Sequence, residues 1–444
     1  MRSPLAQSAG LGELPARPAA GAGRAGPPWP WFLLLPMFFQ IFYYKAETSL
    51  LYPLSKGWAV LMAPLLLYGA TALRLPDGPL YLLLCAYSLA VTPFLSMIYL
   101  PNSLVDALLS TIRAWPLTFY FSFAATLLLL RPSEEALKRG ALAFGLATFG
   151  SMVLLWFTVP EAWYQPGAFG ANLFSWDDGR GNYIRMPMML GELALFWMWR
   201  RFLLEWRPWQ FLVSVAAVVA LATMYKARLP IGVSVLIMTA TLVLRLPSRW
   251  LWGLGALAML PVAGAAMVYG PGLPELLGHI FDESLFIRLR SSVIAWDWIT
   301  SDPLKLLFGS GSTSSYSEIT MADFFGYADF WLTDIGWLGV LMEYGAIGFA
   351  MIAAIHARAL ITARAARNGT AFRSALMDYV AFELLCSVVY SVMYAPGPVV
   401  TVAVIAWWLR MRDAAGMAAD QPGWPDTATP VPQGGRIGLE QPAG

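Results

Sequence analysis

The sequence has little of what metal, redox or disulfide-based proteins require. Cys85 and Cys386 are its only cysteines, and both lie inside apolar runs with no CxxC pattern. His279 and His356 are its only histidines, too few for a histidine-based metal cluster. The chain therefore predicts neither a metal site nor a disulfide framework.

Charge is scarce as well. Only 13% of the 444 residues are charged, whereas 58% are hydrophobic, and the net charge is +2. The basic residues are scattered rather than gathered in a stripe with aromatic residues, which excludes nucleic acid as a partner. A mean hydropathy of +0.59 is too high for a soluble domain of this length, so the chain is expected to be a polytopic membrane protein.

Apolar runs recur along the chain, and about 20 apolar residues suffice to cross a bilayer as a helix. They predict an all-α fold of about twelve transmembrane helices, near residues 29–44, 57–73, 79–99, 107–130, 140–159, 186–199, 209–225, 229–244, 250–269, 332–356, 375–394 and 398–410. A very tight turn separates the seventh helix from the eighth. No internal repeat is visible, which weakens a transporter interpretation.

The orientation follows from Lys and Arg in the short loops, which favour the cytoplasm. With the N-terminus inside, the cytoplasmic loops collect Arg74, Arg131, Lys138, Arg139, Arg200, Arg201, Arg207, Arg245, Arg249, Arg358, Arg364, Arg367, Arg373, Arg410 and Arg412. Both termini are then expected in the cytoplasm. The predicted organisation is a disordered tail at 1–28, helices 1–9 within 29–269, a large extracytoplasmic loop at 270–331, helices 10–12 within 332–410 and a disordered tail at 411–444.

A few basic residues fall on the outer side, where few are expected: Arg180, Arg185, Lys226, Arg228, Arg288, Arg290 and Lys305. Arg228 lies between two apolar helices, where it either snorkels to lipid headgroups or binds an anion through its guanidinium. Arg288 and Arg290 are two residues apart on a short amphipathic helix expected to end before Asp302, so only one should face a common site. Arg113 either joins this group or, as we favour, pairs with Asp106.

Acidic residues near the membrane supply the other half of a possible site. Asp334 precedes an apolar helix, where it either accepts a proton from a hydroxyl group or favours the helix N-terminus electrostatically. Glu343 is expected about 13 Å deeper along that helix, paired within the bundle. Glu192, Asp378 and Glu383 are expected to form hydrogen bonds between helices before acting as proton relays.

The most specific pattern lies between Met224 and Gly348. Ala227-Arg228 is followed by Arg288, by a turn from Pro303 to Gly311, and by Asp334 leading into the segment Glu343-Tyr344-Gly345-Ala346-Ile347-Gly348. This order resembles the superfamily of O-antigen ligases and Wzy-type polysaccharide polymerases, which are membrane glycosyltransferases. Ligases of the family carry His where this chain has Asp334, which favours the polymerase branch, and the turn is longer than usual.

The resemblance implies a GT-C-like fold with its large extracytoplasmic loop between helices 9 and 10. It implies a metal-independent and cofactor-free polymerase that transfers glycan from an undecaprenyl-diphosphate donor to an acceptor glycan at the outer face of a bacterial inner membrane. Arg185, Arg228 and Arg288 would bind the diphosphate, Asp334 would act on the acceptor, and Arg180, Lys226 and Arg290 would bind substrate. Membrane lipid and a chain-length regulator are further expected partners. The alternatives are a ligase that transfers a finished glycan and, from another class, a polysaccharide flippase or secondary transporter.

Overall fold

A computed structural model describes residues 29–43, 50–166, 173–177, 180–245, 273–313, 317 and 319–419. Within these ranges, the helices long and apolar enough to cross a membrane are Gly78–Tyr99, Leu104–Leu130, Glu134–Thr158, Pro208–Tyr225 and Gly336–Ala366. Two shorter apolar helices are Trp29–Phe38 and Arg228–Val243. These apolar helices indicate a membrane protein. The expected tail at 1–28 and helix at 250–269 lie outside the described residues, so the count of twelve stays a prediction.

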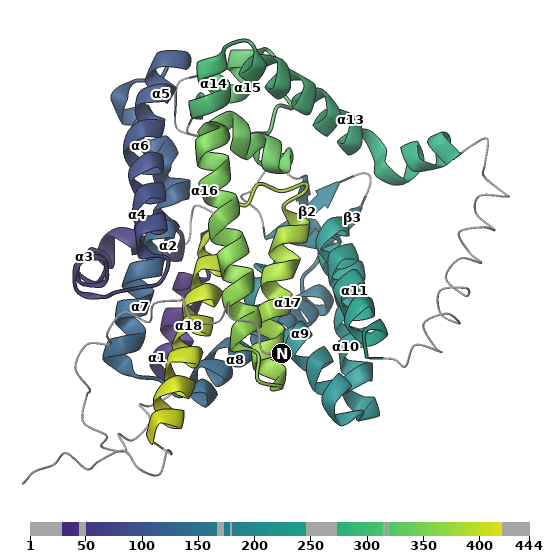
Figure 1. The fold of residues 1–444 in the computed structure, drawn as a ribbon. Coiled ribbons are helices and arrows are strands. Elements are labelled where there is room, and N and C mark those ends of the chain that lie inside the picture. The colour runs from purple at the N-terminus through teal and green to yellow at the C-terminus, as the bar shows by residue number, and fades with distance from the viewer. Residues whose placement is uncertain are drawn as a thin grey trace, which may run out of the picture.

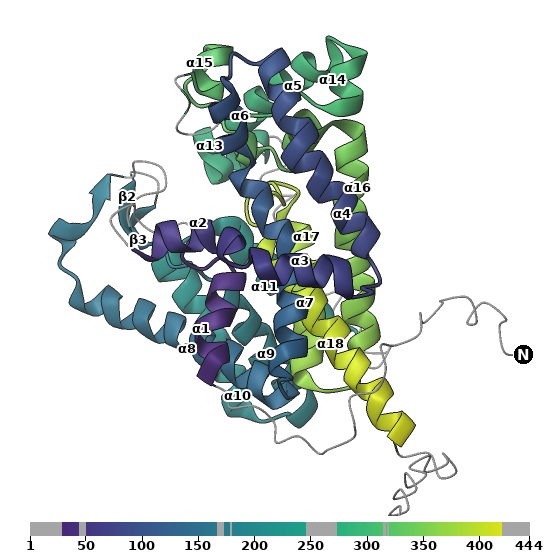
Figure 2. The ribbon, with the colours of Figure 1, turned by 90° about the vertical axis from the view of Figure 1, so that its left-hand side faces the viewer.

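The structure near the N-terminus differs from one of the predicted transmembrane helices. After α1 (Trp29–Phe38), the predicted helix at 57–73 is instead two short helices, α2 (Leu51–Leu61) and α3 (Ala63–Ala72). Met62 leaves helical geometry between them, and Pro64 in the first turn of α3 has no N–H to continue the ladder. Figure 2 shows α2 and α3 running across the direction of α4 and α16. The single span predicted here is therefore wrong.

The next helices follow the predicted spans closely. α4 (Gly78–Ala86) continues through a π-helical turn (Tyr87–Val91) into α5 (Thr92–Tyr99), and α6 (Leu104–Ser110) continues through a 3₁₀ turn (Thr111–Thr118) into α7 (Phe119–Leu130). They are followed by α8 (Glu134–Thr158), α9 (Met189–Glu205), α10 (Pro208–Ala220) with a π-helical turn (Leu221–Tyr225), and α11 (Arg228–Val243). The tight turn before α11 is confirmed, because Lys226 takes the left-handed conformation with φ 54°.

A small sheet interrupts the all-α pattern between α8 and α9. A 3₁₀ turn (Glu161–Trp163) leads to β1 (Gln165–Pro166), which pairs parallel to β2 (Phe174–Asp177), and β2 pairs antiparallel to β3 (Gly181–Ile184). Gly181 takes a φ of 65° at the turn of the hairpin, and the Asp177 side chain accepts a hydrogen bond from the Arg180 N–H at 2.7 Å. The expectation of a purely helical fold is therefore wrong for this segment. Strands this short leave almost no periodic signal in the sequence.

The expected large loop carries helices of its own. They are α13 (Leu273–Thr300), α14 (Pro303–Phe308) and α15 (Met321–Phe325), and they lie at the upper end of α16 in Figure 1. A 3₁₀ turn (Leu332–Asp334) follows, where the sequence predicted the start of a transmembrane helix. α13 ends before Asp302, as predicted, and the Asp302 carboxylate caps α14 by accepting from the Leu304 N–H at 2.9 Å. α13 is longer than the short amphipathic helix expected.

α16 (Gly336–Ala366) reverses direction within its length. Gly345 has a φ of 63° and a ψ of −176°, outside helical geometry. The Trp337 ring consequently lies 5.1 Å from the Phe349 ring and 5.9 Å from the His356 ring, centroid to centroid. A straight helix would place residues 337 and 356 about 28 Å apart. The segment before Gly345 therefore folds back on residues 346–366, whose length of about 31 Å matches a bilayer core.

The C-terminal helices differ from the prediction at their ends. α17 (Ala371–Cys386) stops well before residue 394, and residues 387–396 form a loop that leads into α18 (Gly397–Ala419). Pro396 and Pro398 flank the start of α18 and prevent one continuous helix. The expectation of a disordered tail from residue 411 is wrong as far as Ala419, because α18 continues to that residue.

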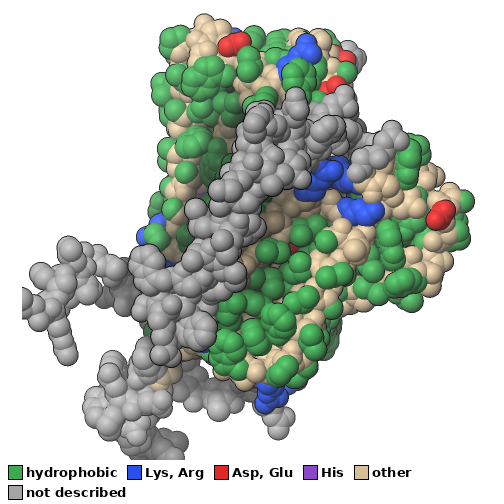
Figure 3. Space-filling view, turned by 90° about the vertical axis from the view of Figure 1, so that its right-hand side faces the viewer, with side chains coloured by type: hydrophobic (Ala, Val, Ile, Leu, Met, Phe, Trp, Pro, Cys, Tyr) green, Lys and Arg blue, Asp and Glu red, His purple; other side chains and the backbone are tan. Residues whose placement is uncertain are grey.

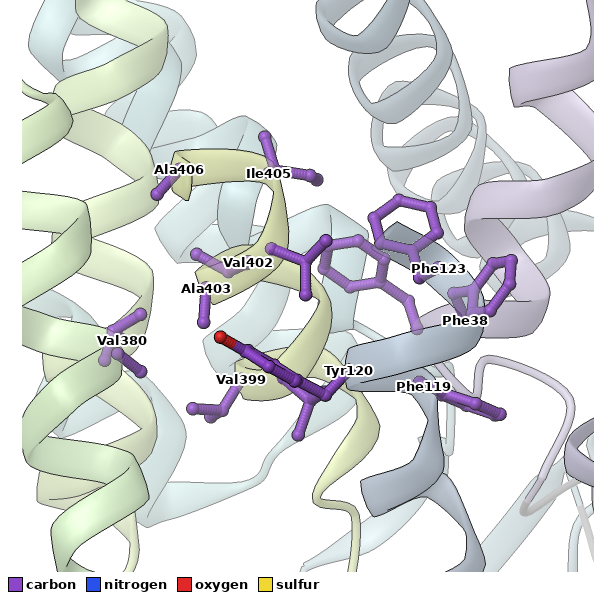
Figure 4. Close-up of a cluster of buried hydrophobic side chains, with 14 of the residues drawn as sticks. Phe38, Phe119, Tyr120, Phe123, Val380, Val399, Val402, Ala403, Ile405 and Ala406 are labelled. Atoms are coloured by element: carbon purple, nitrogen blue, oxygen red, sulfur yellow. The ribbon is translucent and has the colours of Figure 1, made fainter. Parts of the chain in front are cut away.

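Aromatic packing and buried ion pairs hold the helices together. Phe38 of α1 lies 5.1 Å from Phe119 and 4.5 Å from Phe123 of α7, in a cluster that Figure 4 shows against α18. Arg373 at the start of α17 binds Glu134 at the start of α8 and Asp413 near the end of α18. These helix ends therefore lie on one side of the molecule, and the loop at 387–396 lies at the opposite end of α17.

Candidate functional site

The turn from Pro303 to Gly311 and the segment from Glu343 to Gly348, the two glycine motifs of the sequence, contact each other. Gly309 and Gly311, after α14, pack against the bend of α16, where Ser310 N–H donates to the Met342 carbonyl at 2.9 Å. A Cβ at Gly345 would lie 2.3 Å from the Gly309 nitrogen, so only glycine allows this approach. Both glycines also have positive φ, 85° for Gly309 and 63° for Gly345. The motifs thus form one joint between α14 and α16.

Side chains from the π-helical turn after α4 and from the loop after α14 complete the joint. The Tyr87 hydroxyl donates to the carbonyls of Phe308 at 2.6 Å and Tyr344 at 3.0 Å. Ser312 Oγ donates to Glu343 Oε1 at 2.9 Å, which confirms that Glu343 pairs within the protein. The expected deeper position of Glu343 is wrong, because the helix reverses at Gly345 and Glu343 lies at the joint with α14.

The loop at 387–396 fixes the segment that carries Asp334. The Ser391 N–H donates to the Thr333 carbonyl at 2.8 Å, and Trp337 Nε1 donates to Ser387 Oγ at 2.8 Å. Gly336 has a φ of 55° and lies so close to the loop that an added Cβ would be 2.4 Å from the Val388 carbonyl oxygen. Asp334 is therefore held between the end of α17 and the start of α16.

The charge of Arg288 on α13 acts on Asp334. Burial raises the pKa of the Asp334 carboxyl above its ordinary value, and the positive charge of Arg288 and a hydrogen bond from Thr333 offset part of that rise. The Arg288 guanidinium lies 5.8 Å from the Tyr390 ring centroid, and its buried Nε has no hydrogen-bond partner among the described residues. Arg290 is exposed and lies over Tyr327 at 4.4 Å. The two arginines diverge, as their spacing predicts, and Arg288 is the one beside Asp334.

Further arginines surround the two tyrosines of the 387–396 loop. Burial raises the pKa of Tyr394 to about 12, while the charges of Arg113 and Arg185 lower it and that of Asp334 raises it. Burial also raises the pKa of Tyr390, on which Arg288 and Arg180 act in the opposite direction. Figure 3 shows Lys and Arg side chains gathered in a hollowed part of one face. The loop therefore lies within a field of positive charge that also contains Asp334.

Arg113 joins this group rather than pairing with Asp106. Asp106 Oδ2 instead accepts a hydrogen bond from Ser103 Oγ at 2.6 Å at the start of α6. The Arg113 charge acts on Glu343 and on Tyr394. The pairing favoured from the sequence is therefore wrong. Asp106 lies close to Ser103 in the chain, and this local contact takes the place of the longer one.

The remaining predicted ligands lie at the β-hairpin and the α11 turn. Arg185 donates to the Tyr183 hydroxyl at 3.0 Å, and Arg180 pairs with Asp177 at 3.1 Å. Lys226 Nζ donates to the Arg180 carbonyl at 2.6 Å, which ties the hairpin to the turn before α11. Arg228 is the exposed first residue of α11. Arg180 and Lys226 thus have structural partners, whereas Arg185 adds its charge to that around Tyr394.

A cavity of about 260 Å³ adjoins this loop. It is lined by Met188, Met189, Glu192, Tyr225, Ala227, Pro230, Phe382, Glu383, Cys386, Ser387, Tyr390, Ser391, Val392, Tyr394 and Ala395. Glu192 Oε2 accepts from Ser234 Oγ of α11 at 2.9 Å, which confirms the expected hydrogen bond between helices. Asp378, another of the three intramembrane acids, binds Arg200 through two hydrogen bonds of 2.5 and 2.6 Å, away from the cavity.

No family model matches this chain, and no curated protein matches it. In the part of the chain that the structure describes, no three His, Cys, Asp or Glu side chains are grouped to hold a metal ion. The guanidinium groups whose charges act on Asp334 and on the two tyrosines can bind an anionic group, and the Asp334 carboxylate can accept a proton from a nearby hydroxyl.

Sequence reasoning did not find Tyr390 and Tyr394, which lie at the centre of this arrangement. They fall in the predicted helix 375–394, and their role depends on contacts with Asp334 and Arg288 far away in the chain. One local signal was available. The proline-rich run Ala395-Pro396-Gly397-Pro398 indicates a loop between two helices rather than a continuous span.

Proposed function

We propose that the protein is a membrane glycosyltransferase that polymerises repeat units of an exopolysaccharide or O-antigen. It transfers glycan from an undecaprenyl-diphosphate donor to a hydroxyl group of an acceptor glycan, at the outer face of the inner membrane. The observation that carries this proposal is the placement of Asp334 beside Arg288, with Arg113 and Arg185 close to the same tyrosine loop. The resemblance of the glycine-containing segments to the superfamily supports it, and Asp334 in place of the ligases' His favours the polymerase branch.

The side chains suit the chemistry of this transfer. The acceptor oxygen forms a bond to the anomeric carbon of the donor sugar, and the bond from that carbon to the diphosphate oxygen breaks. The hydroxyl proton passes to the Asp334 carboxylate, and the lipid diphosphate leaves with the bonding electron pair. Negative charge therefore grows on the phosphate as the bond breaks, and preorganised guanidinium groups stabilise it.

Arg288 is the leading ligand for the leaving diphosphate. Its Nε is buried and has no hydrogen-bond partner among the described residues, so it has a donor left for an anion. The charges of Arg185 and Arg113 act on Tyr394 in the same loop. Arg228 stays in the proposed set because Ala227 and Pro230 beside it line the cavity. Arg290 is left out because its guanidinium lies over Tyr327.

Purified protein supplied with lipid-diphosphate-linked repeat units tests this function. Without nucleotide, added metal or an ion gradient, the glycan should lengthen and lipid diphosphate should be released. A transporter would instead move the lipid-linked glycan between the leaflets of a vesicle and leave its length unchanged. Transport without bond formation, or elongation that requires a gradient, would contradict the proposal.

A further inference from the structure

The cavity lies beside the loop at 387–396, the tyrosine loop, and its two ends differ in charge. Tyr390 and Tyr394 line one end, where the Arg288 guanidinium lies 5.8 Å from the Tyr390 ring centroid. Glu192, in the first turn of α9, and Glu383, near the end of α17, line it within the helix bundle. Most of the remaining wall is apolar, with side chains such as Phe382. A ligand in this cavity therefore meets positive charge at one end and carboxyl groups at the other.

Glu192 has an unused hydrogen-bonding atom in this cavity. Its side chain is buried, at 2% exposure, and Ser234 Oγ holds its Oε2 at 2.9 Å. Its Oε1 is also buried and has no hydrogen-bond partner among the described residues. A buried polar atom without a partner is costly, so a ligand that hydrogen-bonds Oε1 gains more here than one that does not. Ser234 fixes the carboxyl group, which leaves Oε1 for such a ligand.

The surroundings select the chemical class of this ligand. Glu192 and Glu383 interact electrostatically with each other, and their carboxyl groups disfavour an anion between them. A hydrocarbon chain would leave Glu192 Oε1 without a partner. A cation would have to pass the positive charge around Tyr394. A neutral group that carries hydroxyls meets none of these penalties.

We infer that this cavity is a subsite for a neutral, hydroxyl-bearing group, held by hydrogen bonds to Glu192 and Glu383. The inference rests on the proposed function, under which this group is the sugar attached directly to the donor diphosphate. The diphosphate then lies at the arginines around Tyr394, and its sugar enters the cavity beneath them. A volume of about 260 Å³ equals that of about nine water molecules, which is room for one sugar ring.

Binding of two probes to the purified full-length protein tests the subsite. The probes are undecaprenyl diphosphate and the same lipid carrying one hexose, supplied separately as glucose, galactose and N-acetylglucosamine forms. In the wild type, the hexose-bearing lipid that binds best should have a Kd about 10-fold lower than that of the sugar-free lipid, as expected for one or two hydrogen bonds. Glu192→Leu should abolish this gain and leave the Kd of the sugar-free lipid unchanged. Glu192→Gln, which keeps a hydrogen-bonding side chain, should retain most of it.

Two further variants keep the test decisive. Ser234→Ala releases Glu192 Oε2 without adding bulk, and it should reduce the sugar-dependent gain by about 3-fold. Glu205→Gln, at the exposed far end of α9, should leave the gain intact. No gain from any sugar in the wild type, or the same gain in Glu192→Leu, would overturn the subsite. Failure of the proposed function has a different signature, because the wild type would then not lengthen lipid-diphosphate-linked repeat units, whatever its affinity for the added sugar.

Discussion

At the scale of single residues, Arg288 and Arg290 offer a matched comparison. They belong to the same helix and carry the same charge, but Arg288 lies beside Asp334 and Tyr390, whereas Arg290 lies exposed over Tyr327. Lysine keeps the charge and loses the planar fork that binds two phosphate oxygens. The comparison therefore separates phosphate binding from the general effect of positive charge on α13.

We expect Arg288→Lys to lower the rate of glycan elongation by about 10²-fold, since one preorganised charge-stabilising contact contributes about 3 kcal/mol. Arg290→Lys should keep the rate within about 2-fold of wild type, because exposed charges contribute little. Both variants are measured with purified protein at equal amounts. Equal losses in the two variants would show that Arg288 has no special role.

The pH dependence of elongation reports on Asp334. Burial raises its pKa, and the Arg288 charge lowers it. Asp334 accepts a proton only when ionised, so activity should fall as the pH drops through this raised pKa, above the ordinary value of 3.8. Arg288→Gln removes the lowering charge, so the acid limb of its residual activity should move to higher pH. Arg288→Lys, which keeps the charge, should leave the limb nearly in place, and a limb that is identical in Arg288→Gln would exclude Asp334 as the titrating group.

At the scale of elements, the joint between α14 and α16 decides where Asp334 lies. Gly345 reverses α16, and this reversal brings Trp337 against Phe349 and His356. The same reversal returns the Asp334 segment to the end of α17, where Ser391 binds Thr333. The geometry of the site therefore depends on a glycine that contacts no proposed substrate.

Gly345→Ala should destabilise the protein strongly. The new Cβ would lie 2.3 Å from the Gly309 nitrogen, and the φ of 63° is unfavourable for alanine. We expect a fall in Tm of several degrees in detergent, together with loss of elongation. Gly232→Ala in α11 is the control, because no atom lies within 4 Å of its added Cβ, and alanine is the better helix former by about 1 kcal/mol. An unchanged Tm in Gly345→Ala would contradict the close packing of Gly345 against Gly309.

The sequence predicts elements well where the signal is local. Apolar runs locate most helices, the turn at Lys226 is recognisable, and Asp302-Pro303 marks the end of α13. The reversal at Gly345 is not predictable in this way, because it depends on contact with Gly309. The resemblance implies that Arg288 and Asp334 act at one site, whereas the contribution of Arg113 and Tyr394 depends on tertiary packing.

At the scale of the whole molecule, the charged helix ends and the site lie at opposite ends of α17. Arg373 joins Glu134 and Asp413 at its start, and the tyrosine loop follows its last residue, Cys386. From the distribution of Lys and Arg, we propose that the first of these ends faces the cytoplasm. The proposed reaction then takes place on the outer side of the membrane.

Single cysteines in a Cys85→Ser and Cys386→Ser background test this arrangement. Asn368 is exposed between α16 and α17, and Ser301 is exposed between α13 and α14. A membrane-impermeant maleimide added to intact spheroplasts should label Ser301→Cys, and it should label Asn368→Cys only after lysis. Labelling of both from the same side would contradict the two-sided arrangement of the molecule.

The central claim is that Asp334 acts in glycosyl transfer from a lipid diphosphate, and one measurement tests it most directly. It compares the lipid diphosphate released by wild type and by Asp334→Asn with the number of glycosidic bonds formed. Wild type should release one lipid diphosphate per bond. Asp334→Asn should bind the donor with a similar Kd but turn over at least 10²-fold more slowly, whereas Asp329→Asn, at an exposed position nearby, should match wild type. Wild-type turnover by Asp334→Asn, or bonds formed without release of lipid diphosphate, would contradict the claim.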